Sequence, residues 1–312
     1  MEIKSSVNVI GQMNIDLIYL NINRFPNNGE EVFADDFVIS LGGGPMVIPI
    51  QLNRLGISTK LGTFLGNDYQ SRIAADLLND IGYTNVVNFP TDKKHPVVVT
   101  SVLSTSKERT FICYNEGANE LEVEEGNLLN FYNDCSICFC PNNLELAKTL
   151  KSNGKTLVFD VGWTDDLSLE KIKGYLEVSD YFTPNEKEAK KLTNTDNLIK
   201  SLDILQEYTS KPIIKLGDSG CICKVDNSYY LVPSAPGIKP IDPTGAGDNF
   251  LTGLIYGIHE GYDLIDTLKI ANILGGLSTE VMGCYRDDIS YDLIMKYMEK
   301  MGDARLIDSL DR

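Results

Sequence analysis

The sequence predicts an α/β fold of three layers, in which helices cover both faces of a mostly parallel central sheet, together with a small β-sheet that forms a lid. Short runs rich in Val, Ile and Phe alternate with longer helical patterns, and this alternation is typical of a parallel sheet. Two stretches, at about 16–40 and 97–115, instead have the pattern of strands joined by polar turns without helices. We therefore expect a single domain over residues 1–312, with the lid strands inserted at these two places.

The elements can be placed in order along the chain. The expected strands of the central sheet are the runs VNVIG, TKLGTFLG, SICFC, TLVFD and PIIKLG. The spacing of apolar residues predicts helices at about 68–81, 143–152, 185–193 and 197–208, and a mostly helical last third. The sequence has no internal repeat or long linker, which favours one domain with a lid over two domains joined by a hinge.

The composition narrows the classes of function. The formal net charge of −16 repels nucleic-acid backbones and anionic membranes, so neither is an expected partner. No run approaches the roughly 18 apolar residues of a membrane span. Seven cysteines and two histidines, without a second cysteine pair at finger-like spacing, indicate a reduced, cytoplasmic protein with buried strand cysteines rather than a zinc site. Small-molecule chemistry becomes the leading class.

The most informative stretch is IDPTGAGDNF, because small residues precede a helical pattern there. Gly245, Ala246 and Gly247 open this helix, so the backbone N–H groups of residues 245–248 can face a ligand. The helix dipole adds positive potential, which makes an anion hole suited to phosphate. Asp248, held ionised on the first turn, would take the proton of an attacking hydroxyl in phosphoryl transfer. The alternative is that Asp248 only interacts with the helix dipole.

At this point the sequence resembles the ribokinase-like (PfkB) carbohydrate kinases. DPTGAGDNF is similar to the family's C-terminal signature, and VIGQMNID, SLGGGPM, TPNEKE and KLGDSG resemble four further elements of the family in the same order. Five elements in order are more specific than any single glycine motif. The resemblance implies a ribokinase-like fold, the use of ATP and Mg²⁺, and a sugar or sugar-like alcohol as the acceptor.

The resemblance assigns the acceptor site to four residues near the N-terminus. Asn14 and Asp16 correspond to residues that bind acceptor hydroxyls, and Gly42 and Gly43 to the substrate-binding Gly-Gly. Asn14 and Asp16 also follow the first buried strand, and open α/β sheets bind ligands beyond the carboxyl ends of their strands. The alternative is an Asx-type turn that leads into the lid.

The segment after Gly-Gly departs from the family's pattern. Members commonly have an acceptor-binding Asn after three further residues, where this chain has Val47. Valine cannot hydrogen-bond a sugar hydroxyl, so we expect an acceptor that has an apolar portion or is held elsewhere. Pro49 would strain a helix that began at Pro45, so we expect helical geometry to start one or two residues later than usual.

The resemblance also assigns residues to metal ions. Asn185 and Glu188 correspond to the family's Asn-x-x-Glu element, and they share a helix face from which both could reach a hydrated magnesium ion. The alternative is a capping Asn followed by a solvated helix. Asp242 and Thr244 fall where some members bind a monovalent cation such as K⁺.

The nucleotide is expected over a glycine turn. Gly217 and Gly220 would let the backbone approach the nucleotide, and Lys215 would neutralise phosphate charge. A strand-end turn with a surface lysine is the alternative. Asn272 lies where the family lines its adenine pocket with a helix.

We therefore predict an ATP- and Mg²⁺-dependent kinase that moves the γ-phosphoryl group to a hydroxymethyl group of a sugar-like acceptor. A nucleoside kinase of the same fold is the nearest alternative, and a non-catalytic ligand-binding regulatory protein is another. A phosphorylated acceptor is disfavoured because the first 60 residues contain only four basic side chains. We expect the lid residues to pack or to form a homodimer contact rather than to catalyse; the candidates are Phe33, Phe37, Arg109 and Tyr114.

Overall fold

The computed structural model describes residues 6–105, 108–118 and 120–307 and contains a large and a small β-sheet. The strands of the large sheet are β1 (Ser6–Ile10), β4 (Thr59–Thr63), β5 (Val86–Asn88), β8 (Cys135–Phe139), β9 (Thr156–Phe159), β10 (Tyr181–Phe182), β11 (Lys211–Lys215), β12 (Cys221–Val225), β13 (Ser228–Val232) and β14 (Arg305–Leu306). Their order is β14-β13-β12-β11-β10-β9-β8-β1-β4-β5. All pairs from β5 to β11 are parallel, and β12, β13 and β14 add antiparallel pairs. The mostly parallel central sheet is confirmed.

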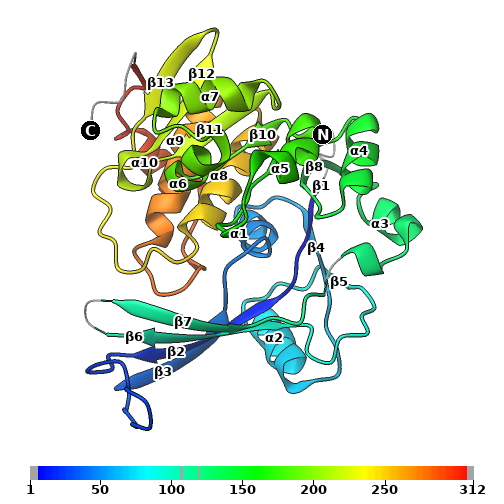
Figure 1. The fold of residues 1–312 in the computed structure, drawn as a ribbon, viewed down its shortest axis with the longest axis vertical. Helices are drawn as coiled ribbons and strands as arrows, with labels where there is room; N and C mark the ends of the chain where they lie inside the picture. Colours follow the sequence, from blue (N-terminus) through cyan, green and yellow to red (C-terminus); the bar gives the residue numbers. More distant parts are fainter. Residues whose placement is uncertain (1–5, 106–107, 119, 308–312) are drawn as a thin grey trace.

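Helices cover both faces of this sheet (Figure 1). They are α1 (Val47–Arg54), α3 (Glu125–Phe131), α4 (Leu144–Ser152), α5 (Leu169–Val178), α6 (Glu186–Thr193), α7 (Leu198–Gln206), α8 (Ala246–Glu260), α9 (Leu264–Ser278) and α10 (Tyr291–Met298). Ile213 packs into the core that contains α1, α8, α9 and α10, whereas its neighbour Ile214 packs into the core that contains α6 and α7. Successive residues of a strand point to opposite faces, so β11 has a helical layer on each side.

Helices α8 and α9 pack closely because glycines line their contact. A Cβ atom on Gly253 would lie 2.6 Å from the Cα atom of Ala271. A Cβ atom on Gly257 would lie 2.7 Å from Oγ1 of Thr267. Real Cβ atoms do not approach other atoms so closely, so this helix contact requires glycine at both positions. This packing fixes α8, whose N-terminus forms the site described below.

The small sheet contains β2 (Asn14–Leu20), β3 (Asp36–Leu41), β6 (Val98–Ser104) and β7 (Arg109–Tyr114), in the order β3-β2-β6-β7. Figure 1 shows this lid apart from the large sheet, with helix α2 (Tyr69–Asp80) beside it. Apolar residues of α2 share a core with Ile15 and Leu41 of the lid. Aromatic and aliphatic side chains on β3 and β7 remain exposed, among them Phe37, Phe111 and Ile112. The predicted lid strands are present, although residues 106 and 107 of the second stretch lie outside the described residues.

The predicted helices agree with α2, α4, α6 and α7 to within two residues at each end. Helix α1 begins at Val47, which puts Pro49 in its first turn. A first-turn N–H has no partner within the helix, so proline is tolerated there. The sequence did not place α3 or α5, because each buries only two residues of an otherwise polar pattern. Within the described ranges, the chain has no helix that is long and apolar enough to cross a bilayer.

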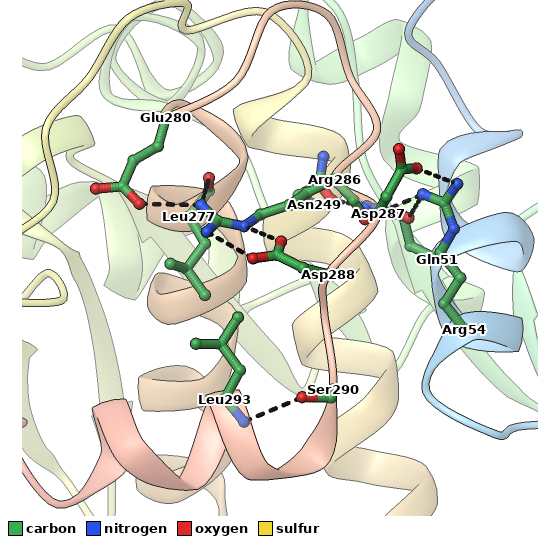
Figure 2. A network of polar contacts seen from close by, with 10 residues as sticks. All are labelled: Gln51, Arg54, Asn249, Leu277, Glu280, Arg286, Asp287, Asp288, Ser290 and Leu293. Atoms are coloured by element: carbon green, nitrogen blue, oxygen red, sulfur yellow. Dashed lines mark hydrogen bonds and ion pairs between the residues drawn. The ribbon is translucent and has the colours of Figure 1, made fainter.

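A buried polar network joins α1 to the start of α8 (Figure 2). Gln51 Nε2 donates to Asn249 Oδ1 at 3.2 Å, and Arg54 donates to Gln51 Oε1 at 2.7 Å. Asn249 Nδ2 donates to the carbonyl oxygens of Gly245 and Cys284, both at 2.9 Å. The network holds the helix that follows Gly-Gly against the loop that precedes α8.

Candidate active site

The N-terminus of α8 is where the sequence analysis places an anion hole, and the structure differs from that expectation at one residue. Gly245 has φ of +74°, and a Cβ atom there would lie 2.8 Å from Cβ of Cys284. Only glycine is suited to this position. The N–H of Ala246 donates to the carbonyl of Pro243 at 3.2 Å, so it closes a turn instead of facing a ligand. The N–H groups of Gly247 and Asp248 lie in the first helical turn, where no intrahelical acceptor exists.

Asp248 faces the loop formed by residues 42–44. The N–H of Gly44 donates to Asp248 Oδ2 at 2.9 Å, and a Cβ atom on Gly43 would lie 3.0 Å from the same oxygen. Burial raises the pKa of Asp248, the charge of Asp160 raises it further, and the Gly44 hydrogen bond opposes both. The sequence predicted a carboxylate held ionised by the helix dipole, whereas burial makes this group a stronger base.

Asn14 and Asp16 lie in β2, the first lid strand, and not at the end of β1 as expected. Asp16 is 4% exposed, and a Cβ atom on Gly42 would lie 2.6 Å from its Oδ1 atom. Burial raises the pKa of Asp16 to about 6, with a further increase from the charge of Asp242. The lid therefore carries the carboxylate that the sequence analysis assigned to the acceptor, and it lies beside the Gly-Gly loop.

Arg109 of lid strand β7 reaches across to the loop before α8. Its guanidinium forms an ion pair with Asp242, which is 1% exposed, and lies 3.4 Å from Thr244 Oγ1. Asp242 also accepts hydrogen bonds from the N–H groups of Thr244 at 2.9 Å and Gly283 at 3.0 Å. Burial alone would raise the pKa of Asp242, but these hydrogen bonds and the charge of Arg109 hold it below its usual value. Sequence reasoning treated Arg109 as a lid-packing or subunit-contact residue and did not predict this contact.

A partly buried ion pair that the sequence analysis missed lies beside the N-terminus of α8. Lys215 Nζ lies 2.9 Å from Asp160 Oδ2, and 3.6 Å from the position of a Cβ atom on Gly247. Asp160 Oδ1 is buried without a hydrogen-bond partner among the described residues. Burial raises the pKa of Asp160, and Lys215 opposes this increase. The signal was available, because Asp160 is the last residue of the predicted strand TLVFD.

Asn185 and Glu188 form a reciprocal cap at the start of α6. Asn185 Oδ1 accepts from the N–H of Glu188 at 3.0 Å, and Glu188 Oε2 accepts from the N–H of Asn185 at 2.8 Å. Burial raises the pKa of Glu188, and the nearby charge of Asp160 raises it further. The capping alternative is therefore correct for these contacts, and the buried carboxylate also faces the Asp160–Lys215 pair. The described residues contain no group of three or more metal-ligating side chains.

The glycine turn after β11 is shaped by backbone contacts. Gly217 and Gly220 have φ of +62° and +94°, and a Cβ atom on Gly220 would overlap the carbonyl of Val232. Asn272 Nδ2 donates to the carbonyls of Val232 and Pro233 at 3.1 and 3.0 Å. Asn272 therefore holds the end of β13 against the glycine turn.

A cavity of about 340 Å³ opens next to the acceptor residues. Asn14 and Gly43 line it at one side, and Glu120 and Asn142 also contribute to its wall. Its apolar lining comes from Ile10, Pro45, Met46, Val98, Phe139 and Cys140. Val47 is fully buried and does not line this cavity, so Met46 and Pro45 provide the apolar surface near Gly-Gly.

A basic carboxylate beside an anion hole, with a second carboxylate on a covering lid, defines the site of a phosphotransferase with an alcohol acceptor. Residues 4–290 match the pfkB family carbohydrate kinases, and the chain belongs to this family. The resemblance, the ribokinase-like fold and the carbohydrate kinase class are confirmed.

Several relatives span nearly the whole chain. The ribokinase of Lactococcus lactis is 26% identical over 89% of this chain and 92% of its own length. The nucleoside kinase of Methanocaldococcus jannaschii is 22% identical over 94% of this chain and 97% of its own. The structure of Arabidopsis thaliana ribokinase with ribose and ATP superposes with a TM-score of 0.81 at 22% identity, covering 95% of this chain and 99% of that one.

Proposed function

We propose that the protein transfers the γ-phosphoryl group of ATP to a hydroxymethyl group of a sugar or sugar-like alcohol, with Asp248 as the base. The position of Asp248 carries this proposal. Its carboxylate contacts the 42–44 loop on one side, and its own N–H belongs to the anion hole on the other. A hydroxyl held at the loop would therefore lie between the base and the phosphoryl group. The proton passes from that hydroxyl to Asp248 as the new O–P bond forms and ADP leaves.

Other residues position the reactants in this proposal. Asp16 and Asn14 accept hydrogen bonds from acceptor hydroxyls. The absence of side chains on Gly42 and Gly43 lets their loop lie directly against Asp16 and Asp248. The N–H groups of Gly247 and Asp248 bind the transferring phosphoryl group. Lys215 neutralises phosphate charge from the position beside Gly247. The glycine turn and the helix that carries Asn272 form the wall of the nucleotide site.

The residues near the anion hole fit a magnesium ion. The buried Oδ1 atom of Asp160 lacks a partner, and Glu188 uses only Oε2 in its cap. Oxygen ligands are those that Mg²⁺ prefers, and it usually keeps several waters. We propose that Glu188, Asp160 and Asn185 hold the hydrated ion, which would neutralise charge on the nucleotide phosphates.

A monovalent cation fits the surroundings of Asp242 and Thr244 less well than Mg²⁺ fits those of Glu188 and Asp160. Both carboxylate oxygens of Asp242 already have partners, since Thr244 and Gly283 donate backbone hydrogen bonds and Arg109 forms the ion pair. Arg109 supplies the positive charge that K⁺ would bring. We therefore expect the reaction not to depend on K⁺.

Two further expectations rest on surface and composition. The exposed apolar residues of β3 and β7 support a homodimer formed through the lid, because an uncovered apolar sheet face favours a partner. The cytoplasmic location rests on the seven cysteines, which include six buried and one exposed free thiol.

The test is acceptor-dependent release of ADP by wild type and the Asp248→Asn variant. Loss of the base should lower kcat by about 10²- to 10⁴-fold, while circular dichroism and nucleotide affinity stay unchanged. Near-normal turnover by a folded variant would refute the role of Asp248. A regulatory protein without catalysis would release no ADP with any acceptor.

A further inference from the structure

The cavity beside the acceptor site has an acidic wall. Glu120 is 5% exposed and belongs to the short 3₁₀ helix Glu120–Glu122 that follows the last lid strand. Burial raises its pKa, against opposing hydrogen bonds from the N–H groups of Glu120 and Asn142. Among the described side chains, no lysine, arginine or histidine forms an ion pair with Glu120. The carboxylate is thus buried at a ligand-accessible cavity without a cation.

Gln12 is a further polar residue of this cavity. Gln12 lines the cavity, and its Nε2 atom donates to the carbonyl of Pro96 at 2.6 Å. That contact fixes the orientation of the amide, so that Oε1 can accept a hydrogen bond and the second N–H of Nε2 can donate one. A ligand group beside Glu120 therefore meets an acceptor, and it must supply the donor.

The cavity disfavours anionic acceptors. Of the described residues that line it, none is basic, and one is a carboxylate. A phosphate or carboxylate substituent would be desolvated beside Glu120 with no compensating positive charge, which is strongly unfavourable. The buried carboxylate of Glu120 also has a desolvation cost of its own. An N–H group that donates a hydrogen bond to this carboxylate compensates that cost. A protonated amine adds charge neutralisation that a hydroxyl cannot supply.

The apolar lining defines the rest of the acceptor. Phe139, Met46 and Pro45 offer surfaces that suit the face of a ring rather than a shell of hydroxyl groups. The cavity volume of about 340 Å³ corresponds to about eleven molecules of liquid water. A ring substituent beyond the phosphorylated hydroxymethyl group would fit this space.

We infer that the acceptor carries a nitrogen donor, mounted on a ring with an apolar face, that hydrogen-bonds to Glu120. This inference rests on the proposed function and names its substrate class. An amino sugar and a nucleoside both present such a nitrogen, so the chemistry they share is an N–H group on the ring system that carries the reactive hydroxyl. Sugar acids and sugar phosphates are excluded as preferred acceptors.

The experiment compares acceptors that differ in nitrogen. Coupled ADP release is measured with glucosamine against glucose and with adenosine against ribose, and gluconate and fructose 6-phosphate represent anionic acceptors. The nitrogen-bearing member of at least one pair should have the higher kcat/KM, by about 10- to 100-fold, as expected for a hydrogen bond to a charged group. The pair that shows the preference identifies the source as amino sugar or nucleoside.

The variant Glu120→Gln tests the residue itself. It should erase the preference within that pair by lowering kcat/KM for the nitrogen-bearing member. The matched control is Glu122→Gln, because Glu122 lies on the same short helix, is exposed and forms a surface ion pair with Lys93. This control should keep the preference. Equal preference in wild type and Glu120→Gln would overturn the inference, and so would a nitrogen-free or anionic acceptor with the highest kcat/KM.

Calorimetric binding separates this inference from the proposed function. If no acceptor releases ADP, the proposed function fails, but binding of glucosamine or adenosine can still be measured. Binding that weakens about tenfold or more in Glu120→Gln, and not in Glu122→Gln, supports the nitrogen site. Absence of binding by both nitrogen-bearing ligands overturns it.

Discussion

The charge on Asp16 should make the folded protein less stable at neutral pH. The pKa of this carboxyl rises from its ordinary 3.8 to about 6 on folding, mainly through burial. Each tenfold change in an ionisation equilibrium corresponds to about 1.4 kcal/mol, so ionisation of Asp16 costs the folded state about 3 kcal/mol above pH 6. Below pH 3.8 the group is protonated in both states and this cost is absent. Between pH 3.8 and about pH 6, the contribution of Asp16 to the free energy of unfolding falls as the pH rises.

The variant Asp16→Asn removes the charge while keeping the shape. We expect its free energy of unfolding in urea to exceed that of wild type by about 3 kcal/mol at about pH 7.5, and the difference to vanish near pH 4. Its kcat/KM for the acceptor should fall by about 10- to 100-fold, because hydrogen bonds to a charged group are lost. Asp35→Asn, at an exposed position of the same segment, should change stability by less than about 0.5 kcal/mol.

Two results would contradict this reasoning. If Asp16→Asn were less stable than wild type at neutral pH, the buried charge would not be the dominant contribution at this position. If the difference between the two proteins were constant from about pH 4 to about pH 7.5, the titration of Asp16 would not cause it.

Two further predictions concern the loop before α8. Arg109→Ala should lower kcat by about 10²-fold, because the contact between the lid and the loop is lost. Replacing Na⁺ by K⁺ should leave wild-type kcat unchanged. Steady-state kinetics in the two salts check both expectations, and strong activation of wild type by K⁺ would contradict the role given to Arg109. Gly245→Ala should destabilise the protein by about 1–3 kcal/mol because of its positive φ, and by more than Gly261→Ala, where φ is +80° and a Cβ atom would meet nothing within 4 Å. Urea unfolding of the two variants measures the difference, and equal losses would show that overlap with the neighbouring cysteine is unimportant.

The parts of the site that are local in sequence could be predicted. The small residues before Asp248 are contiguous with the helix they open, so their spacing alone indicates a helix N-terminus. The reciprocal cap of Asn185 and Glu188 is likewise contained in four residues. Chain order also indicated the lid, since its strands come as two pairs without helices between the members of each pair.

The parts that depend on long-range packing could not be predicted. The contact of Arg109 with Thr244 joins residues 135 positions apart, and the pair of Lys215 and Asp160 joins residues 55 positions apart. The periodicity of apolar residues along the chain does not indicate which strand ends lie close together. The placement of Asp16 failed for a related reason, because the chain leaves the large sheet at Ile10 and joins the lid before that carboxylate is reached.

The lid strands bear Asp16, the proposed acceptor carboxylate, and also Arg109, which contacts Asp242 in the loop before α8. Capture of the alcohol and exclusion of water would therefore be one movement rather than two. Without a bound alcohol, the closed position of the lid over the nucleotide lacks the contacts with Asp16. A water molecule would then not be aligned for attack on the phosphoryl group. We expect a compulsory sequence in which the alcohol binds before productive closure, and very slow hydrolysis of ATP in its absence.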